Sequence, residues 1–348
     1  MSRVQQITIG AEDAGLRLDR WFRQRFPQVT QGRLEKLLRK GEIRVDGKRV
    51  KSAHRIDTGQ TVRVPPLPDA DAPKRPREPA KEKPVSAEAA AELQNRVLYR
   101  DNAVIVLDKP AGLAVQGGSG QSRHLDGMLD ALRFGSGERP RLVHRLDKDT
   151  AGILLLARNA GSARALTAAF RGKTTQKIYW ALVHGVPAEK RGIIDLPLAK
   201  RQAGPGEAMA PVEGEDGKPA QTLYRLVESH KRAVSWLVLM PLTGRTHQLR
   251  VHCAALGLPI IGDGKYGGRA AFPEALGLPK PLHLLARELA VPHPEDGTTL
   301  RQTAALPPHM AESWQKLGFD ERKGEAALEA LLAYAEGISH SPGQGRGA

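Results

Sequence analysis

A proline-rich, charged segment near the N-terminus most constrains how this chain can fold. Residues 65–83 hold six prolines among lysines, arginines and acidic residues. A segment of this composition cannot bury enough apolar surface to form a core, and it is typical of an extended, semi-rigid linker. The 348 residues are therefore expected to fold as separate units on either side of it. We expect a small domain over residues 14–64, a linker over 65–94 that includes a short alanine-rich helix, a large domain over 95–318, and a C-terminal region over 319–348 with one helix and a disordered tail.

The overall charge indicates a polyanionic partner. The chain carries a formal net charge of +15 and has a pI near 10.1, and nucleic acid is the first partner that such a charge suggests. Hydrophobic residues make up 40% of the chain, which is enough for a core, but no apolar stretch is long enough to span a membrane. The N-terminus lacks the apolar segment of a signal peptide, and the single cysteine, Cys253, excludes an internal disulfide and a CxxC zinc site. We therefore expect a cytoplasmic protein that binds no membrane.

The small domain concentrates the positive charge. Residues 14–64 hold 14 Lys and Arg against 5 Asp and Glu, a net of +9. Thr30 is a suitable N-cap for a helix that Gly41 would end, and Asp46-Gly47 between the short segments 43–45 and 48–50 predicts a β-hairpin of two strands. The helix and the hairpin would share a basic surface, formed by Arg33, Lys36, Arg39, Lys40, Arg44 and Lys48. This surface predicts nucleic-acid binding.

The large domain has the pattern of a mixed sheet. Four apolar runs, at residues 103–107, 153–157, 178–183 and 235–240, predict buried strands, and residues 162–170 and 247–256 predict helices. The strands are not spaced as regular βαβ units, so we expect a mixed, mostly antiparallel α+β fold. The chain has no phosphate-binding loop, no dinucleotide-binding glycine motif and no HExxH motif, and we therefore expect neither a cofactor nor a metal.

Three polar stretches of the large domain carry the candidate chemistry. Asp147 lies on the loop that leads into the strand at 153–157, and a carboxylate on such a rigid mount is well placed for catalysis. Tyr179 lies at the head of another strand, on the same side as Lys177. In the third stretch Arg245, His247 and Arg250 surround a predicted helix start, which is a favourable place for anions.

These stretches resemble the motifs of a known enzyme family. HRLDKDTAGILLLAR, KTTQKIYWALVHG and PLTGRTHQLRVH look like the three signature motifs of the RluA family of pseudouridine synthases, and LYRDNAVIVLDKPAGLAVQGGSG and LGLPIIGDGKYGG match that family as well. GLRLDRWFRQRFP, QGRLEKLLRKGEIRVDGKRVK and TGQTVRV resemble the S4 domain, a small RNA-binding module. The resemblance covers residues 14–308 and is greatest to the RluC type, which modifies large-subunit ribosomal RNA. The departures are slight: Ala151 stands where serine is frequent, and Asp46-Gly47 replaces the common Asn-Gly.

The resemblance implies roles for matching positions. Asp147 corresponds to the catalytic aspartate, Tyr179 to the tyrosine that packs on the target base, and Arg250 to the arginine that pairs with the aspartate. Arg145 is similar to a residue that can fill the space left by the flipped base. With Arg245 and His247 it would contact RNA, together with the basic residues of the S4 domain. The implied partner is RNA, with no obligate protein partner.

Pseudouridine formation also suits these residue types physically. The reaction breaks the N1–C1′ bond of uridine and forms a C5–C1′ bond, without a net gain or loss of atoms or electrons. It needs an ionised carboxylate, and a neighbouring arginine lowers the pKa of a buried carboxyl group. The base must leave its stack, and an aromatic side chain can hold it at about 1–3 kcal/mol per base. The sequence leaves open whether Asp147 attacks C1′, adds to C6 or assists glycal formation. Two alternatives also remain: a transfer-RNA or small-subunit RNA target, and a non-catalytic RNA-binding role in ribosome assembly. A glycosidase that uses Asp147 and Asp149 as paired carboxylates is disfavoured, because Asp149 precedes the strand and is more simply a turn residue.

Overall fold

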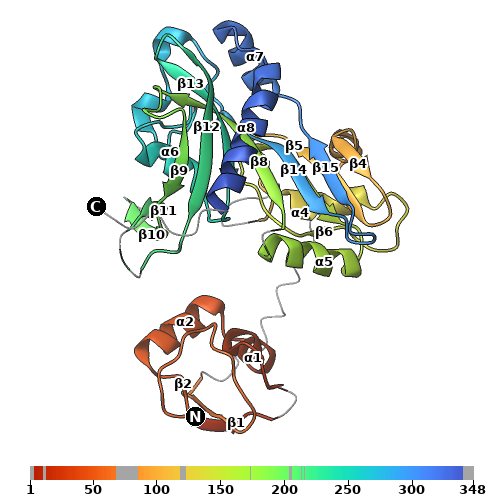
Figure 1. Cartoon of the computed structure of the whole chain (residues 1–348). Coiled ribbons are helices and arrows are strands. Elements are labelled where there is room, and N and C mark those ends of the chain that lie inside the picture. Colours follow the sequence, from red (N-terminus) through yellow and green to blue (C-terminus); the bar gives the residue numbers. More distant parts are fainter. Residues whose placement is uncertain are drawn as a thin grey trace. The chain divides into compact units, whose positions relative to one another are not determined.

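The computed structural model describes residues 4–10, 13–67, 85–117, 123–172, 174–203, 206–212, 214 and 216–339. The chain divides into two units, Met1–Pro84 and Val85–Ala348 (Figure 1). Most of the segment expected as a linker, and nearly all of the tail expected to be disordered, lie outside the described residues.

In its described residues, the first unit contains two α-helices and a small sheet. Its elements are β1 (Gln5–Thr8), α1 (Leu18–Arg25), α2 (Gln31–Lys40), β2 (Arg44–Val45) and β3 (Thr61–Val64), with the strands in the antiparallel order β1-β3-β2. Helix α2 begins and ends as expected. The hydroxyl of Thr30 accepts a hydrogen bond from the Arg33 amide (3.4 Å), and Gly41 ends the helix in the left-handed conformation (φ 72°).

The predicted hairpin around Asp46-Gly47 is only partly present. Both turn residues have positive φ, and Val45 bridges to Lys48, so the tight turn forms. The second strand expected at residues 48–50 does not form, and that part of the prediction is wrong. Strand β2 pairs instead with β3, and Val50 leaves the turn to pack against the core of the unit.

The second unit is built on one large sheet. Ten of the described strands form it, and among the described strand pairs only β7–β14 is parallel, which confirms the mixed, mostly antiparallel α+β class. The main order is β4 (Val97–Arg100), β5 (Val104–Lys109), β7 (Ala151–Ala157), β14 (Leu284–Pro292), β8 (Gln176–His184), β13 (Val234–Pro241), β12 (Gln221–His230) and β9 (Arg191–Asp195); β6 (Arg141–Leu142) pairs with β7, and β15 (Thr299–Thr303) pairs with β14. Strands β10 (Leu198–Ala203) and β11 (Gly206–Pro211) form a separate hairpin.

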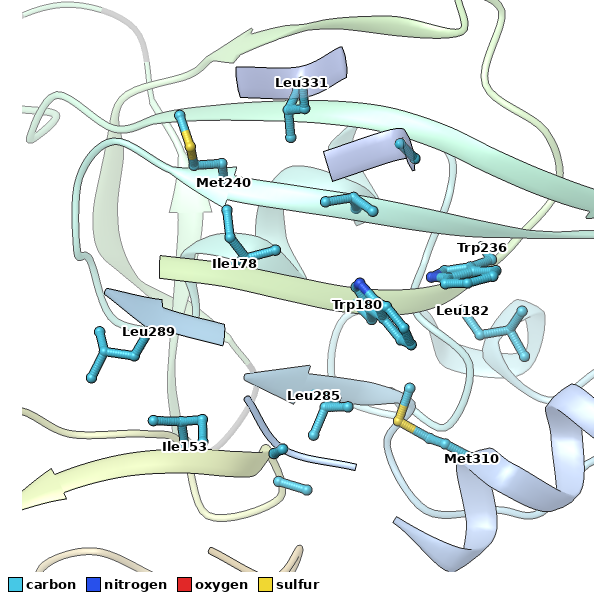
Figure 2. Close-up of a cluster of buried hydrophobic side chains, with 14 of the residues drawn as sticks. Ile153, Ile178, Trp180, Leu182, Trp236, Met240, Leu285, Leu289, Met310 and Leu331 are labelled. Atoms are coloured by element: carbon cyan, nitrogen blue, oxygen red, sulfur yellow. The ribbon is translucent and has the colours of Figure 1, made fainter. Parts of the chain in front are cut away.

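Helices cover both faces of this sheet. On one face α5 (Ala160–Arg171), α7 (Pro308–Leu317) and α8 (Arg322–Ser339) close the main core, in which Trp180 and Trp236 contact edge to face (Figure 2). On the other face α3 (Ala87–Gln94), α4 (Leu125–Met128) and the 3₁₀ helix η2 (Leu129–Leu132) cover one cluster, and α6 (Gln248–Ala255) covers a second. Two further 3₁₀ helices are η3 (Gly268–Ala271) and η4 (Glu274–Leu276).

Helices α3 and α8, at the two ends of the described part of the second unit, both belong to that unit. Helix α3 belongs to it, although the linker was expected to reach residue 94, and α8 packs against β12 rather than forming a separate C-terminal region. Within the described residues, no helix combines the length and apolar character needed to cross a bilayer.

The register of the sheet brings distant motifs together. Gly152 in β7 lies opposite Ala286 in β14, Ala286 lies opposite Tyr179 in β8, and Tyr179 lies opposite Leu239 in β13. Gly152 permits this packing because its φ is +104° and a Cβ there would lie 2.3 Å from the Ala286 carbonyl oxygen. The start of β7, Tyr179 of β8 and Leu239 near the end of β13 therefore lie at the same level across the sheet.

Candidate active site

Asp147 lies on a loop that buried polar contacts hold in place. The Thr150 amide donates to the Asp147 carbonyl oxygen (3.2 Å), which closes the turn before β7. The fully buried ammonium of Lys109 donates to the carbonyl oxygens of Lys148 (2.9 Å), Pro110 (2.8 Å) and Leu113 (2.9 Å). Burial lowers the pKa of Lys109 to about 8, while the charges of Asp149 and Asp147 oppose this shift. Lys109 thus ties the Asp147 loop to the end of β5.

His144 holds the other side of the same loop. Its Nε2 accepts a hydrogen bond from the Leu155 amide of β7 (2.9 Å), and its ring stacks on Phe170 of α5 at 4.5 Å. Burial, with a smaller contribution from Lys177, lowers the pKa of His144 to about 3. The imidazole is therefore neutral, which its role as an acceptor requires.

Tyr179 faces the same side of the sheet as Asp147. On β8, Ile178 and Trp180 enter the main core, whereas Tyr179 contacts both clusters on the opposite face. Lys177 shares that face, as expected from the alternation of a strand. Burial raises the pKa of Tyr179, and the nearby charge of Asp147 raises it further, so the phenol keeps its proton at neutral pH.

Arg250 does not pair with Asp147, and this expectation is wrong. Its guanidinium forms a bidentate ion pair with Asp263, with Nε–Oδ2 at 2.8 Å and Nη2–Oδ1 at 2.7 Å. Both side chains are buried, and a buried aspartate needs such a partner because its charge is otherwise costly to desolvate. Burial alone would lower the pKa of Arg250, but Asp263, with a smaller effect from Asp147, raises it overall. Arg250 thus acts on Asp147 only through longer-range charge.

The side chain of His247 lies close to that of Asp147. Its Nε2 lies 3.9 Å from Asp147 Oδ1, and its Nδ1 lies 2.5 Å from the hydroxyl of Tyr266. His247 is the residue before α6 and adopts a left-handed backbone conformation (φ 54°), which is uncommon for a residue other than glycine. The hydroxyl of Tyr266 also accepts a hydrogen bond from the Met209 amide of β11 (3.3 Å).

Several residues that support the site were not identified from the sequence. Gln248 is buried, and both the nitrogen and the oxygen of its side-chain amide form hydrogen bonds. Its Nε2 donates to Gln221 O and Thr222 Oγ1, and its Oε1 accepts from the Thr243 hydroxyl and the Arg245 amide. Asp263 and Tyr266 lie in LGLPIIGDGKYGG, and Lys109 lies in LYRDNAVIVLDKPAGLAVQGGSG. Both stretches were matched to the family, but neither suggested a role for an individual residue.

The predicted RNA-contacting residues differ in their availability. Arg145 is exposed and lies 3.4 Å from Gln116 Oε1, while Arg245 is half-buried and donates to the Pro219 carbonyl oxygen. In the first unit, Arg44 donates to the carbonyl oxygens of Gly41 and Gly47, so its guanidinium is already partly used. The other predicted residues of that unit, Arg33, Lys36, Arg39, Lys40 and Lys48, are exposed.

The sequence matches two known families. Residues 103–255 match RNA pseudouridylate synthase, and residues 16–62 match the S4 domain. The chain is 37% identical over 322 residues to the ribosomal large subunit pseudouridine synthase C of Haemophilus influenzae, covering 91% of this chain and 96% of that protein. It is 36% identical over 323 residues to the protein of the same name from Vibrio cholerae, covering 91% and 98%.

Solved structures agree with these matches. Human RNA pseudouridylate synthase domain containing 4 superposes with a TM-score of 0.55 at 28% identity, over 66% of this chain and 96% of that one. Human RNA pseudouridylate synthase domain containing 1 superposes with a TM-score of 0.51 at 30% identity, over 61% and 83%. The motifs indicated the correct family, and the chain belongs to the RNA pseudouridylate synthases, with an S4 domain preceding the synthase region.

Proposed function

We propose that this protein isomerises uridines of large-subunit ribosomal RNA to pseudouridine, with Asp147 as the catalytic carboxylate. The observation that carries the proposal is the convergence of the three motif segments around Asp147. The sheet register puts the start of β7 level with Tyr179 across β14, the charge of Asp147 acts on Tyr179, and His247 at the start of α6 lies 3.9 Å from the Asp147 carboxylate. The names of the H. influenzae and V. cholerae relatives support the choice of large-subunit RNA as substrate.

The Asp147 carboxylate is placed to meet a detached base. Its side chain is 26% exposed, so a base that leaves its stack can reach it, while much of the bulk water is kept away. The ring of Tyr179 offers an aromatic surface to that base, and stacking of this kind contributes about 1–3 kcal/mol. Arg250 supplies positive charge near Asp147 without a direct ion pair.

The reaction at this site is a rearrangement within one nucleotide. The N1–C1′ bond breaks, the ring turns, and C1′ bonds to C5; the proton lost from C5 is balanced by one gained at N1. Because the Tyr179 phenol stays protonated, it can donate a hydrogen bond or a proton but is not a ready base at neutral pH. Asp147 is the candidate for the charged role.

The S4 domain would supply additional affinity for RNA. Helix α2 presents Arg33, Lys36, Arg39 and Lys40 to solvent, and Lys48 on the adjoining turn is also exposed. Exposed lysines and arginines bind phosphate groups with little regard for sequence. In the second unit, Arg145 and Arg245 would contact the RNA close to the target, and Arg145 could fill the space that the flipped base leaves.

The direct test uses ribosomal RNA from cells that lack the gene. The purified protein, its Asp147→Asn variant and an Asp149→Asn control are each incubated with this RNA, and pseudouridine is mapped by carbodiimide labelling and reverse-transcription stops. We expect new stops in large-subunit RNA with the wild type and Asp149→Asn, and none with Asp147→Asn, which should still bind RNA. Asp149 is a matched control because it is an exposed carboxylate on the same loop.

The other outcomes separate the alternatives. Near-normal turnover by Asp147→Asn would remove Asp147 from the catalytic role. Stops in transfer RNA but in no ribosomal RNA would assign the other substrate. No modification of any RNA, with binding intact, would favour a non-catalytic role in ribosome assembly.

A further inference from the structure

The hydrogen bonds around Tyr266 bear on which nitrogen of His247 carries the proton. The Tyr266 oxygen accepts from the Met209 amide (3.3 Å) and lies 2.5 Å from His247 Nδ1. A phenol has one proton to donate, and a backbone amide can only donate. With the Tyr266 proton donated to Nδ1, that nitrogen is unprotonated and a neutral His247 carries its proton on Nε2. That is the nitrogen that faces Asp147.

The surroundings keep this pair of side chains neutral. Burial lowers the pKa of His247; the charge of Asp147 opposes this shift, while Arg250 and Lys265 reinforce it. Burial also raises the pKa of Tyr266, so the phenol retains the proton that it donates. The guanidinium of Arg250 lies 5.1 Å from the centre of the Tyr266 ring, which positions the ring from the side of α6.

We propose that His247 is a positioning residue that orients the Asp147 carboxylate by donating a hydrogen bond from Nε2, with its tautomer set by Tyr266. This inference rests on the proposed catalytic role of Asp147. The separation of 3.9 Å is too long for a hydrogen bond. A small rotation or one bridging water closes it, and catalytic contacts often tighten only when substrate binds. In the described part of the chain, no other side chain forms a hydrogen bond or ion pair with this carboxylate.

The backbone supports a dedicated role for this histidine. His247 adopts the left-handed conformation, which costs free energy for a residue with a side chain, yet its side chain does not cap the helix that follows. The strained backbone instead directs the imidazole between Tyr266 and Asp147. Because Met209 belongs to β11, this chain of contacts also links the β10–β11 hairpin to the catalytic loop.

Two substitutions of His247 separate the two ring nitrogens. In His247→Gln the side-chain amide lies near the position of Nε2 and keeps a donor for Asp147. In His247→Asn the shorter amide lies near Nδ1, so it keeps a contact with Tyr266 and loses the donor. Asparagine tolerates the left-handed conformation better than glutamine. If backbone strain decided the outcome, His247→Asn would be the more active variant, whereas the proposal predicts that His247→Gln is the more active one.

We expect the turnover number of His247→Asn on saturating RNA to fall by about 10²-fold, the scale of a misplaced catalytic group. His247→Gln should fall severalfold less, and the dissociation constant for RNA should change little in either variant. Equal turnover numbers of the Asn and Gln variants, or a higher one for the Asn variant, would overturn the proposal. A parallel loss of RNA binding and turnover would also overturn it, because it would reassign His247 to RNA contact.

The tautomer can be measured without any assay of activity. In protein labelled with ¹⁵N-histidine, we expect His247 to show a protonated Nε2 and an unprotonated Nδ1, with the signals assigned by their absence from His247→Gln. In Tyr266→Phe the preference for this tautomer should weaken. A protonated Nδ1 in the wild type would refute the inference, even if Asp147 proved to be catalytic. Conversely, an inactive wild-type protein with the expected tautomer would refute the proposed function alone.

Discussion

The ion pair between Arg250 and Asp263 should make Asp263→Asn strongly destabilising. The Arg250 side chain is 8% exposed and that of Asp263 is 1% exposed, so neither charge is solvated by water. Asparagine keeps the shape of aspartate but removes the countercharge and one of the two acceptor oxygens. Removing one partner of a buried pair costs about 3–5 kcal/mol. With a urea m-value of about 3 kcal/mol/M, this cost lowers the unfolding midpoint by about 1–1.7 M.

Tryptophan fluorescence can report this unfolding. Trp180, Trp236 and Trp314 pack against one another in the core of the second unit. The fourth tryptophan, Trp21, lies in the core of the first unit, so a Trp21→Phe background leaves only the signal of the second. Urea titrations of Asp263→Asn in that background then measure the stability of the unit that contains the site.

An exposed ion pair provides the matched control. Asp216 lies 3.8 Å from Arg201, but its side chain is 80% exposed. Exposed pairs contribute little, so Asp216→Asn should leave the midpoint unchanged within error. If Asp263→Asn shifts the midpoint no further than Asp216→Asn does, then burial of the Arg250–Asp263 ion pair does not determine the stability of the second unit.

Three further predictions concern the frame of the site and the S4 domain. Gly152→Ala should lower the unfolding free energy of the second unit by about 2–4 kcal/mol, because Gly152 has a positive φ and the new Cβ would clash with a carbonyl oxygen of β14. Gly297 also has a positive φ but has open space around it, so Gly297→Ala should lower the unfolding free energy clearly less. Equal losses in the two variants would rule out the steric reason. The folded pKa of Lys109 is about 8, below its ordinary value of 10.5, so the unfolded chain binds more protons between these pH values and the stability due to this group rises with pH in that window. Urea titrations should show the unfolding free energy of the wild type rising relative to that of Lys109→Met from pH 8 to 10.5, by on the order of 3 kcal/mol at most. An unfolding free energy that depends on pH equally in both proteins would contradict this. The double variant Lys36→Ala, Arg39→Ala should weaken RNA binding and reduce the slope of log K against log salt by roughly 1 for each lost phosphate contact, while an unchanged slope would remove α2 from the RNA-binding surface.

Much of the fold follows from local patterns in the sequence. The apolar runs at residues 153–157 and 178–183 became strands β7 and β8 because continuous apolar segments need burial on both faces of a sheet. Thr30 and Gly41 delimit α2 for equally local reasons, since each satisfies backbone groups at a helix end. The turn at Asp46-Gly47 formed as well, but the partner of β2 did not follow from the turn, because β3 competes for the same edge.

The residues of the site also followed from local sequence patterns, but their partners did not. The sequence by itself indicated Asp147, Tyr179 and the stretch that begins α6, because these residue types stand next to strong strand and helix signals. It could not decide which carboxylate Arg250 would bind. Asp263 lies 13 residues further along the chain, and it takes the guanidinium because the packing of α6 leaves both charges without water. The pairing of His247 with Tyr266 also spans 19 residues and depends on the loop after α6 returning to the sheet. Such contacts join groups that are distant in sequence, and only the tertiary structure selects among the partners that their chemistry allows.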